Sequence, residues 1–363
     1  MTPARAVAAL AVCCALVLGG CTDDAAKMRR TPSETTPGTP SASATSSASG
    51  APSGEGAPSA TPSGGGAPAA GLPSVRSPYS LPALMAEEFS SERPRRLRVS
   101  VDDEAYTEWE VRYRSGDLRV SGVLLLPKGK GPFPGVVLNH GYIEPSVYVT
   151  GQGLSREQDF LARQGFAVLH TDYRGHAGSD PASDLDRETR LGYTRDAVNA
   201  VHALAAEPKV DGDRMAMLGR SMGGGVTMNA LVAQPDLVDA AVLYASVSSA
   251  YLDNLRRWTI PERPENAERL FGRFGTPERR PGFWAGLSPR TFFDRIDVPV
   301  LSHHGTLDDS CPLPWARTTH RLMREAGVRS RLEVYEGEQH AFGPQWTASM
   351  ETTVRFLRRH LRG

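Results

Sequence analysis

The segment Gly219-Arg220-Ser221-Met222-Gly223-Gly224-Gly225 most constrains how this chain can fold. It follows Met215–Leu218, an apolar run typical of a buried parallel strand, and precedes a helix-like run, Val226–Ala233. Glycine has no Cβ, so a strand and a helix can approach each other closely at such a turn. The first amides of that helix would point at the serine oxygen. The pattern predicts a serine hydroxyl standing clear of a sheet; an ordinary glycine-rich turn is the alternative.

Apolar strands and amphipathic helices alternate through most of the remaining sequence. Alternation at this spacing predicts βαβ units and a mostly parallel sheet with helices on both faces. The expected strands are 95–101, two strands within 108–126 joined at Ser115-Gly116-Asp117, 135–138, 166–170, 215–218, 238–244, 298–303 and 331–335. The expected helices are 155–164, with Ser155 as its cap, 194–207 and 345–359.

The block 250–288 interrupts this alternation between two expected strands. Long connections of this kind are usually functional, so we expect a small helical lid. Its aromatic residues either pack the lid on the body or contact substrate, and the sequence leaves both open. They are Trp258, Phe271, Phe274, Phe283 and Trp284.

A G-x-S-x-G turn between strand and helix is similar to the nucleophile elbow of the α/β-hydrolases. In that fold a histidine and an acid follow the serine, in the order serine, acid, histidine. His340 lies in a polar, glycine-containing loop directly after the expected strand 331–335. We therefore expect His340 to be the base for Ser221. His320 and His360 fall in helical patterns, and His303 and His304 are expected to pack or shape a turn.

The acid that orients the histidine is expected in the turn after strand 298–303. Asp308 and Asp309 both stand there, and we prefer Asp308. The oxyanion hole needs two backbone N–H donors. We assign them to Met222, directly after the serine, and to Tyr142, in the turn after the strand ending at Leu138. No motif spacing predicts a metal site, and neither a metal nor an organic cofactor is expected.

Several segments together resemble the catalytic domain of the prolyl oligopeptidase family. They are Asp172-Tyr173-Arg174-Gly175, Asp211-Gly212-Asp213-Arg214, the elbow, Ser288-Pro289 and His304-Gly305-Thr306-Leu307-Asp308-Asp309. The resemblance, over about residues 105–361, implies Ser221 as nucleophile, Asp308 as acid and His340 as base. Dienelactone-hydrolase-like esterases share much of the pattern. Full-length family peptidases carry a β-propeller, for which we expect no room before Arg95.

The first 21 residues have the pattern of a bacterial lipoprotein signal. Arg5 is the positive element, Ala6–Leu18 is the apolar run, and Leu18-Gly19-Gly20-Cys21 resembles a lipobox. We expect a signal peptide over residues 1–20 and lipidation of Cys21, which would anchor the protein to a membrane outside the cytoplasm. An ordinary secreted protein is the alternative.

The segment that follows is expected to be a disordered tether, because Pro, Ser, Thr, Gly and Ala dominate residues 31–75. We place a linker over residues 21–77 and the folded domain over 78–363. The chain has 41 basic and 41 acidic residues, so nucleic acid is not expected as a partner. Of the four cysteines only Cys311 lies in the expected domain, so no disulfide framework is expected.

These observations predict a lipid-anchored serine hydrolase that cleaves short peptides or amides through an acyl-enzyme. An esterase of small esters is the first alternative. A catalytically inert binding protein on the same scaffold is the second, because a fold does not by itself imply a function.

Overall fold

The computed structural model describes residues 71–362. The predicted signal peptide, Cys21 and the linker up to residue 70 lie outside the described residues. Residues 71–77 have no regular secondary structure. Among the described helices, none combines the length and the apolar character needed to cross a bilayer.

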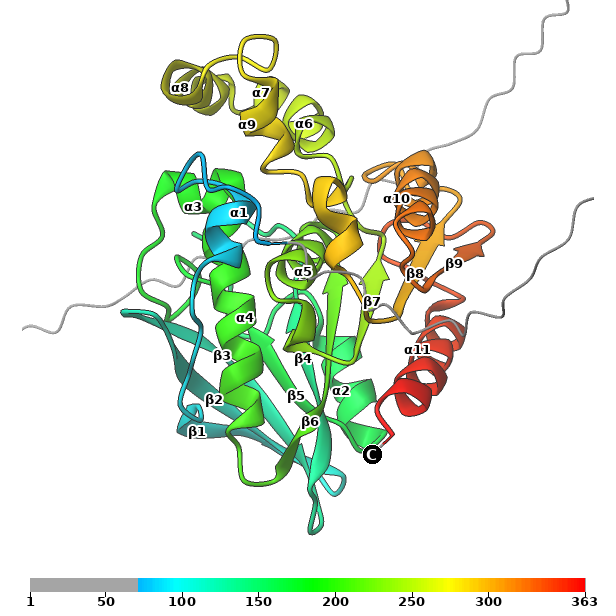
Figure 1. Cartoon of the computed structure of the whole chain (residues 1–363). Helices are drawn as coiled ribbons and strands as arrows, with labels where there is room; N and C mark the ends of the chain where they lie inside the picture. The colour runs from blue at the N-terminus through cyan, green and yellow to red at the C-terminus, as the bar shows by residue number, and fades with distance from the viewer. Residues whose placement is uncertain (1–70, 363) are drawn as a thin grey trace, which may run out of the picture. The chain divides into compact units, whose positions relative to one another are not determined.

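One nine-stranded sheet organises the domain, with strand order β1-β2-β3-β5-β4-β6-β7-β8-β9 (Figure 1). β1 (Arg95–Asp102), β2 (Tyr106–Ser115) and β3 (Leu118–Pro127) form an antiparallel meander with its predicted turn after Ser115. β3 then pairs antiparallel with β5 (Ala167–Thr171). This meander adds an antiparallel edge to the parallel part of the sheet.

The remaining pairs are parallel, as the alternating pattern predicts. They join β5, β4 (Phe133–Asn139), β6 (Val210–Arg220), β7 (Ala240–Tyr244), β8 (Val300–Gly305) and β9 (Ser330–Tyr335). Parallel strands place their carboxyl ends at one edge of the sheet, where ligands bind in open α/β folds. β6 is longer than the apolar run 215–218, because pairing with β4 also holds its polar beginning in the sheet.

Helices cover both faces, which confirms the predicted fold class. α4 (Leu191–Ala205), α5 (Met222–Ala233) and α10 (Leu313–Glu325) contribute to the core on one face. α2 (Ser155–Arg163) and α11 (Trp346–His360) contribute to the core on the other. Apolar side chains of the parallel strands are shared between the two cores, and this double burial explains why the strands are nearly continuous apolar runs.

Two local predictions need correction. Ser155 is the first residue of α2; the N-cap is Leu154, and no side chain within residues 71–362 caps the helix. The helix after the elbow begins at Met222 rather than at Val226. Three consecutive glycines weaken helix propensity, but α5 is fully buried in the domain, and packing overrides that weakness.

The segment 250–288 is the expected helical insertion between β7 and β8. It contains α6 (Tyr251–Asn254), α7 (Ile260–Glu262), α8 (Pro264–Phe274) and α9 (Pro281–Ala285). Figure 1 shows these helices beyond the carboxyl ends of the parallel strands, on the side toward α3 (Asp184–Thr189). Phe271 and Phe283 both pack against Trp284, so packing explains most of the lid aromatics.

Candidate active site

Ser221 occupies a strained turn between β6 and α5. Its backbone has φ 54° and ψ −120°, a left-handed region that residues with a Cβ seldom adopt. A Cβ at Gly219 would lie 2.2 Å from the Gly223 carbonyl oxygen, and one at Gly223 would lie 1.9 Å from that of Asn139. Both glycines are therefore required by close approach, and the turn presents the serine at the carboxyl edge of the sheet.

The loop after β4 passes directly beside this serine. A Cβ at Gly141 would lie 3.1 Å from the Ser221 Cβ and 3.7 Å from its Oγ. The next residue is Tyr142, whose N–H donates to no other described residue. Met222 is the first residue of α5, so its N–H has no acceptor within the helix. The two amides predicted to form the oxyanion hole thus belong to backbone segments that flank the serine.

Buried aromatic residues support that loop. The His140 ring stacks on Tyr148, with ring centres 4.6 Å apart, and contacts the Gly141 and Asp172 carbonyl oxygens at 2.6 and 3.2 Å. Burial lowers the pKa of His140 to about 4, so the ring is neutral at physiological pH. Asp172 accepts from the Tyr148 hydroxyl at 2.9 Å and from the Gly151 N–H at 2.9 Å. These buried contacts of His140, Tyr148 and Asp172 therefore hold the loop in position.

His340 and Asp308 form a direct pair. The His340 Nδ1 lies 3.0 Å from both carboxylate oxygens of Asp308. Asp308 is 7% exposed and also accepts from the backbone N–H groups of Ser310 and Cys311, at 3.0 and 2.8 Å. Asp309 is exposed. Of the two neighbouring aspartates, the structure pairs Asp308 with the histidine.

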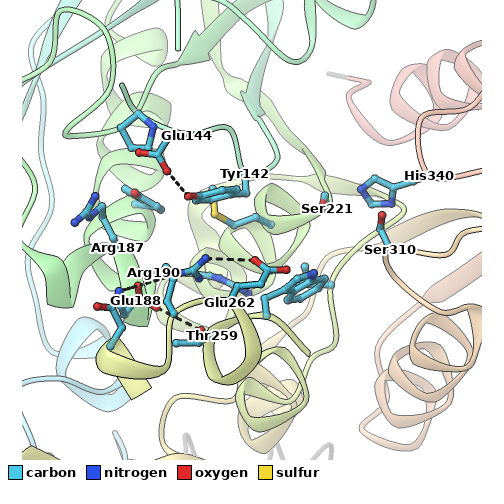
Figure 2. Close-up of a pocket in the computed structure, with 17 residues that line it drawn as sticks. Tyr142, Glu144, Arg187, Glu188, Arg190, Ser221, Thr259, Glu262, Ser310 and His340 are labelled. Carbon is cyan, nitrogen blue, oxygen red and sulfur yellow. Dashed lines mark hydrogen bonds and ion pairs between the residues drawn. The ribbon is translucent and has the colours of Figure 1, made fainter. Parts of the chain in front are cut away.

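Ser221 and His340 line the same pocket, of about 350 Å³ (Figure 2). In the described part of the chain no hydrogen bond joins the Ser221 hydroxyl to the His340 ring. Such bonds are often long before substrate binds. Burial raises the pKa of Cys311 to about 12, so this thiol stays protonated beside the serine.

Two other candidate histidines, His303 and His304, are held by structural contacts. His303 stacks on Tyr244 and bonds to the Tyr335 hydroxyl at 2.8 Å, and burial lowers its pKa to about 3. His304 bonds to the Cys311 carbonyl oxygen at 2.7 Å and lies 3.4 Å from Asp308. Both therefore pack and shape the turn that carries the acid. No group of three or more metal-ligating side chains occurs within residues 71–362.

A buried ion pair connects the elbow with the histidine loop. Glu157, on α2, pairs with Arg220, the residue before the serine, and accepts from the Trp346 indole N–H at 2.8 Å. Arg156 lies over the Trp346 ring at 4.7 Å and donates to the Ala341 carbonyl oxygen at 2.9 Å. One helix thus contacts both segments that carry the candidate nucleophile and base.

Much of the pocket wall comes from residues that the sequence did not single out. They lie on α3, at the start of α4 and on the lid: Arg187, Glu188, Arg190, Tyr193, Thr259, Glu262, Arg263 and Asn266. Trp258 is the lid aromatic residue among the lining side chains. Charged residues in a helical pattern usually lie on a solvent-exposed face. The sequence therefore contains no signal that identifies these residues as part of a pocket.

One protein family matches the sequence of this chain. The profile of the prolyl oligopeptidase family matches residues 152–363, more than half of the chain. The match includes the serine, the acid and the histidine described above.

Individual proteins resemble the chain in sequence or in fold. The chain is 27% identical to the uncharacterized peptidase YtmA of Bacillus subtilis, over 65% of this chain and 87% of that protein. It is also 27% identical to the human acylamino-acid-releasing enzyme, over 65% of this chain but 32% of that enzyme, so it spans about a third of it. The acetyl xylan esterase from Paenibacillus sp. R4 has the same fold, with a TM-score of 0.59 at 18% identity, over 77% of this chain and 92% of that one.

Proposed function

Because the chain belongs to the prolyl oligopeptidase family and is a serine hydrolase, we propose that it cleaves short peptides or amides through an acyl-enzyme. The proposal depends on one observation, that the candidate nucleophile and the candidate base line the same pocket. Ser221 stands on a strained elbow, and His340, paired with buried Asp308, lines the same pocket. A lid insertion over this pocket favours short substrates.

In this mechanism the Ser221 hydroxyl attacks the scissile carbonyl carbon while His340 accepts the serine proton. Asp308 fixes the ring through Nδ1 and stabilises the imidazolium that forms. The Tyr142 and Met222 N–H groups donate to the negative oxygen of the tetrahedral intermediate. His340 then protonates the leaving amine, and a water activated by the same histidine releases the acyl group. The proton transfer requires a hydrogen bond between the Ser221 hydroxyl and His340 Nε2 in the substrate complex.

Hydrolysis of small esters is the second candidate. It is supported by the likeness in fold to the acetyl xylan esterase, of which the comparison covers 92%. Profiling with short p-nitrophenyl esters and aminoacyl anilides separates the two functions. Comparable activity on anilides supports the peptidase, whereas turnover of esters alone supports the esterase.

The Ser221→Ala variant tests the assignment common to both functions. We expect a loss of about 10⁴-fold or more in kcat, the scale of triad deletions in other serine hydrolases. A fluorophosphonate probe should label the wild-type protein at Ser221 and leave the variant unlabelled. Near-wild-type hydrolysis by the variant would contradict the assignment, and absence of labelling in the wild type would favour an inert scaffold.

We also propose that the protein is a lipoprotein held outside the cytoplasm by acyl chains on Cys21. The motif Leu18-Gly19-Gly20-Cys21 supports this proposal. Cys21→Ala should move the protein from the membrane fraction to the soluble fraction. Continued membrane retention of that variant would count against lipidation.

A further inference from the structure

The active-site pocket is lined by three glutamates and three arginines, and their pairing is uneven. These side chains are Glu144, Glu188, Glu262, Arg187, Arg190 and Arg263. Five of them have a side-chain partner: Tyr142 donates to Glu144, Asn266 to Glu188 and Arg187 to Asp184, and Arg263 pairs with both Glu188 and Glu262. The guanidinium of Arg190 has neither a hydrogen bond nor an ion pair with any residue in 71–362.

Arg190 is also held in an uncommon backbone conformation. It is at once the C-cap of α3 and the N-cap of α4, with φ 61° and ψ 6°. Glycine or asparagine usually occupies such a left-handed junction, because a Cβ makes the conformation costly. An arginine at this position makes the folded backbone less stable than a glycine would. A residue kept in such a strained conformation beside a pocket is a candidate for a functional role.

The position of the guanidinium relative to the serine follows from α5. Arg190 Nη1 lies 3.3 Å from where a Cβ on Gly225 would stand, in the first turn of the helix that starts after Ser221. Ser221 and Arg190 both line the active-site pocket, so a substrate held at the serine can extend toward the guanidinium.

The surroundings of Arg190 disfavour a bare charge. Burial lowers the pKa of its guanidinium, and nearby Tyr251 and Glu188 oppose that effect only in part. Arginine nevertheless stays protonated in proteins. The side chain is partly buried in the pocket wall and has no acceptor among residues 71–362, so an incoming anion would supply the hydrogen-bond acceptors that its N–H groups lack.

We propose that Arg190 forms a subsite, in the same pocket as Ser221, for a carboxylate carried by the substrate. The planar fork of a guanidinium matches a carboxylate through two parallel hydrogen bonds. Glu188 and Glu262 in the same pocket disfavour a group with two negative charges, such as a phosphate. This subsite rests on the proposed hydrolase function, and it makes acidic acyl groups or free C-terminal carboxylates the preferred substrates.

Matched substrate pairs test the subsite and locate the carboxylate. On the acyl side the pair is mono-p-nitrophenyl glutarate and p-nitrophenyl butyrate. On the leaving side it is an acetylated tripeptide with a free and with an amidated C-terminus. For Arg190→Gln, the ratio of kcat/KM between charged and neutral substrate should fall about 10- to 100-fold in one of the two pairs, the scale of charge-assisted hydrogen bonds. Arg195→Gln is the control, since Arg195 lies on the same helix, pairs with Glu87 and does not line the pocket.

Binding without turnover gives a second measurement. The Ser221→Ala variant should bind mono-p-nitrophenyl glutarate about 10- to 100-fold more tightly than Ser221→Ala/Arg190→Gln does, by calorimetry. Arg190→Gly should melt at or above the wild-type temperature, because it removes both the strained φ and an unpaired charge. A purely structural arginine would lower that temperature instead.

The subsite is overturned if Arg190→Gln leaves the charged-to-neutral ratio unchanged in both pairs, or if the two Ser221→Ala proteins bind the glutarate ester equally. Failure of the proposed function is a different result: the wild type would then hydrolyse no substrate and resist the fluorophosphonate probe, while the calorimetric comparison would still decide the subsite.

Discussion

The buried contact between α2 and the elbow leads to a quantitative prediction for Glu157→Gln. The Glu157 side chain is 1% exposed and that of Arg220 is 12% exposed, so water screens the pair weakly. The substitution keeps the shape of the side chain but removes its charge. Breaking a buried ion pair from one side costs about 3–5 kcal/mol, because the other charge stays buried.

We therefore expect the free energy of unfolding to fall by about 3 kcal/mol, and the melting temperature to fall by about 6 °C or more in a domain of this size. Catalysis should change as well. Arg220 precedes Ser221, and Trp346 follows the histidine loop. A displacement of about 1 Å at either place lowers kcat by up to about 100-fold. KM should change less than kcat.

Melting curves and steady-state kinetics, both recorded well below the melting temperature, measure the two effects. Asp159→Asn is the matched control on the same helix, because Asp159 is 43% exposed and its pair with Arg163 is worth under about 1 kcal/mol. The double variant Glu157→Gln/Arg220→Met removes both charges and should recover most of the stability.

The outcomes separate positioning from simple stability. If the double variant regains stability but keeps a low kcat, the pair positions the elbow. If kcat recovers together with stability, or if Glu157→Gln never lowers kcat by more than about twofold, the positioning argument is refuted. An unchanged melting temperature in Glu157→Gln would refute the argument from burial.

Two further predictions follow from the same geometry. Asp308→Asn should lower kcat by about 10⁴-fold, because the imidazole loses its orienting charge, whereas Asp309→Asn should stay within about threefold of wild type; comparable losses in both would contradict the pairing. Acid should destabilise the domain between pH 6.5 and 4, because unfolded histidines take up protons there while His140 and His303, with folded pKa values of about 4 and 3, do not. The free energy of unfolding, measured by urea titration, should be lower at pH 4.5 than at pH 7.5 by about 2 kcal/mol for each of the two histidines. The difference should be smaller in His303→Gln. A free energy of unfolding that stays constant or rises on acidification would refute this prediction.

The local steric requirements of the elbow were readable from the sequence. A serine between glycines, after an apolar run, has few alternatives, because any Cβ at 219 or 223 would collide with neighbouring backbone. The parallel strands were readable for a related reason: burial on both faces leaves an unbroken apolar run. The chain order of serine, acid and histidine followed from the resemblance to α/β-hydrolases.

Tertiary structure alone decided the features that depend on contacts between distant segments. Asp308 and Asp309 are chemically identical neighbours, and only the packing of their loop buries one against His340 and exposes the other. In the sequence Arg190 looks like any charged surface residue, but the fold places it between α3 and α4, in the wall of the pocket and without a side-chain partner among residues 71–362. The sequence by itself determines which local backbone conformations are sterically possible. Which charged side chains pair depends on distances between segments far apart in the chain, and no local sequence pattern contains those distances.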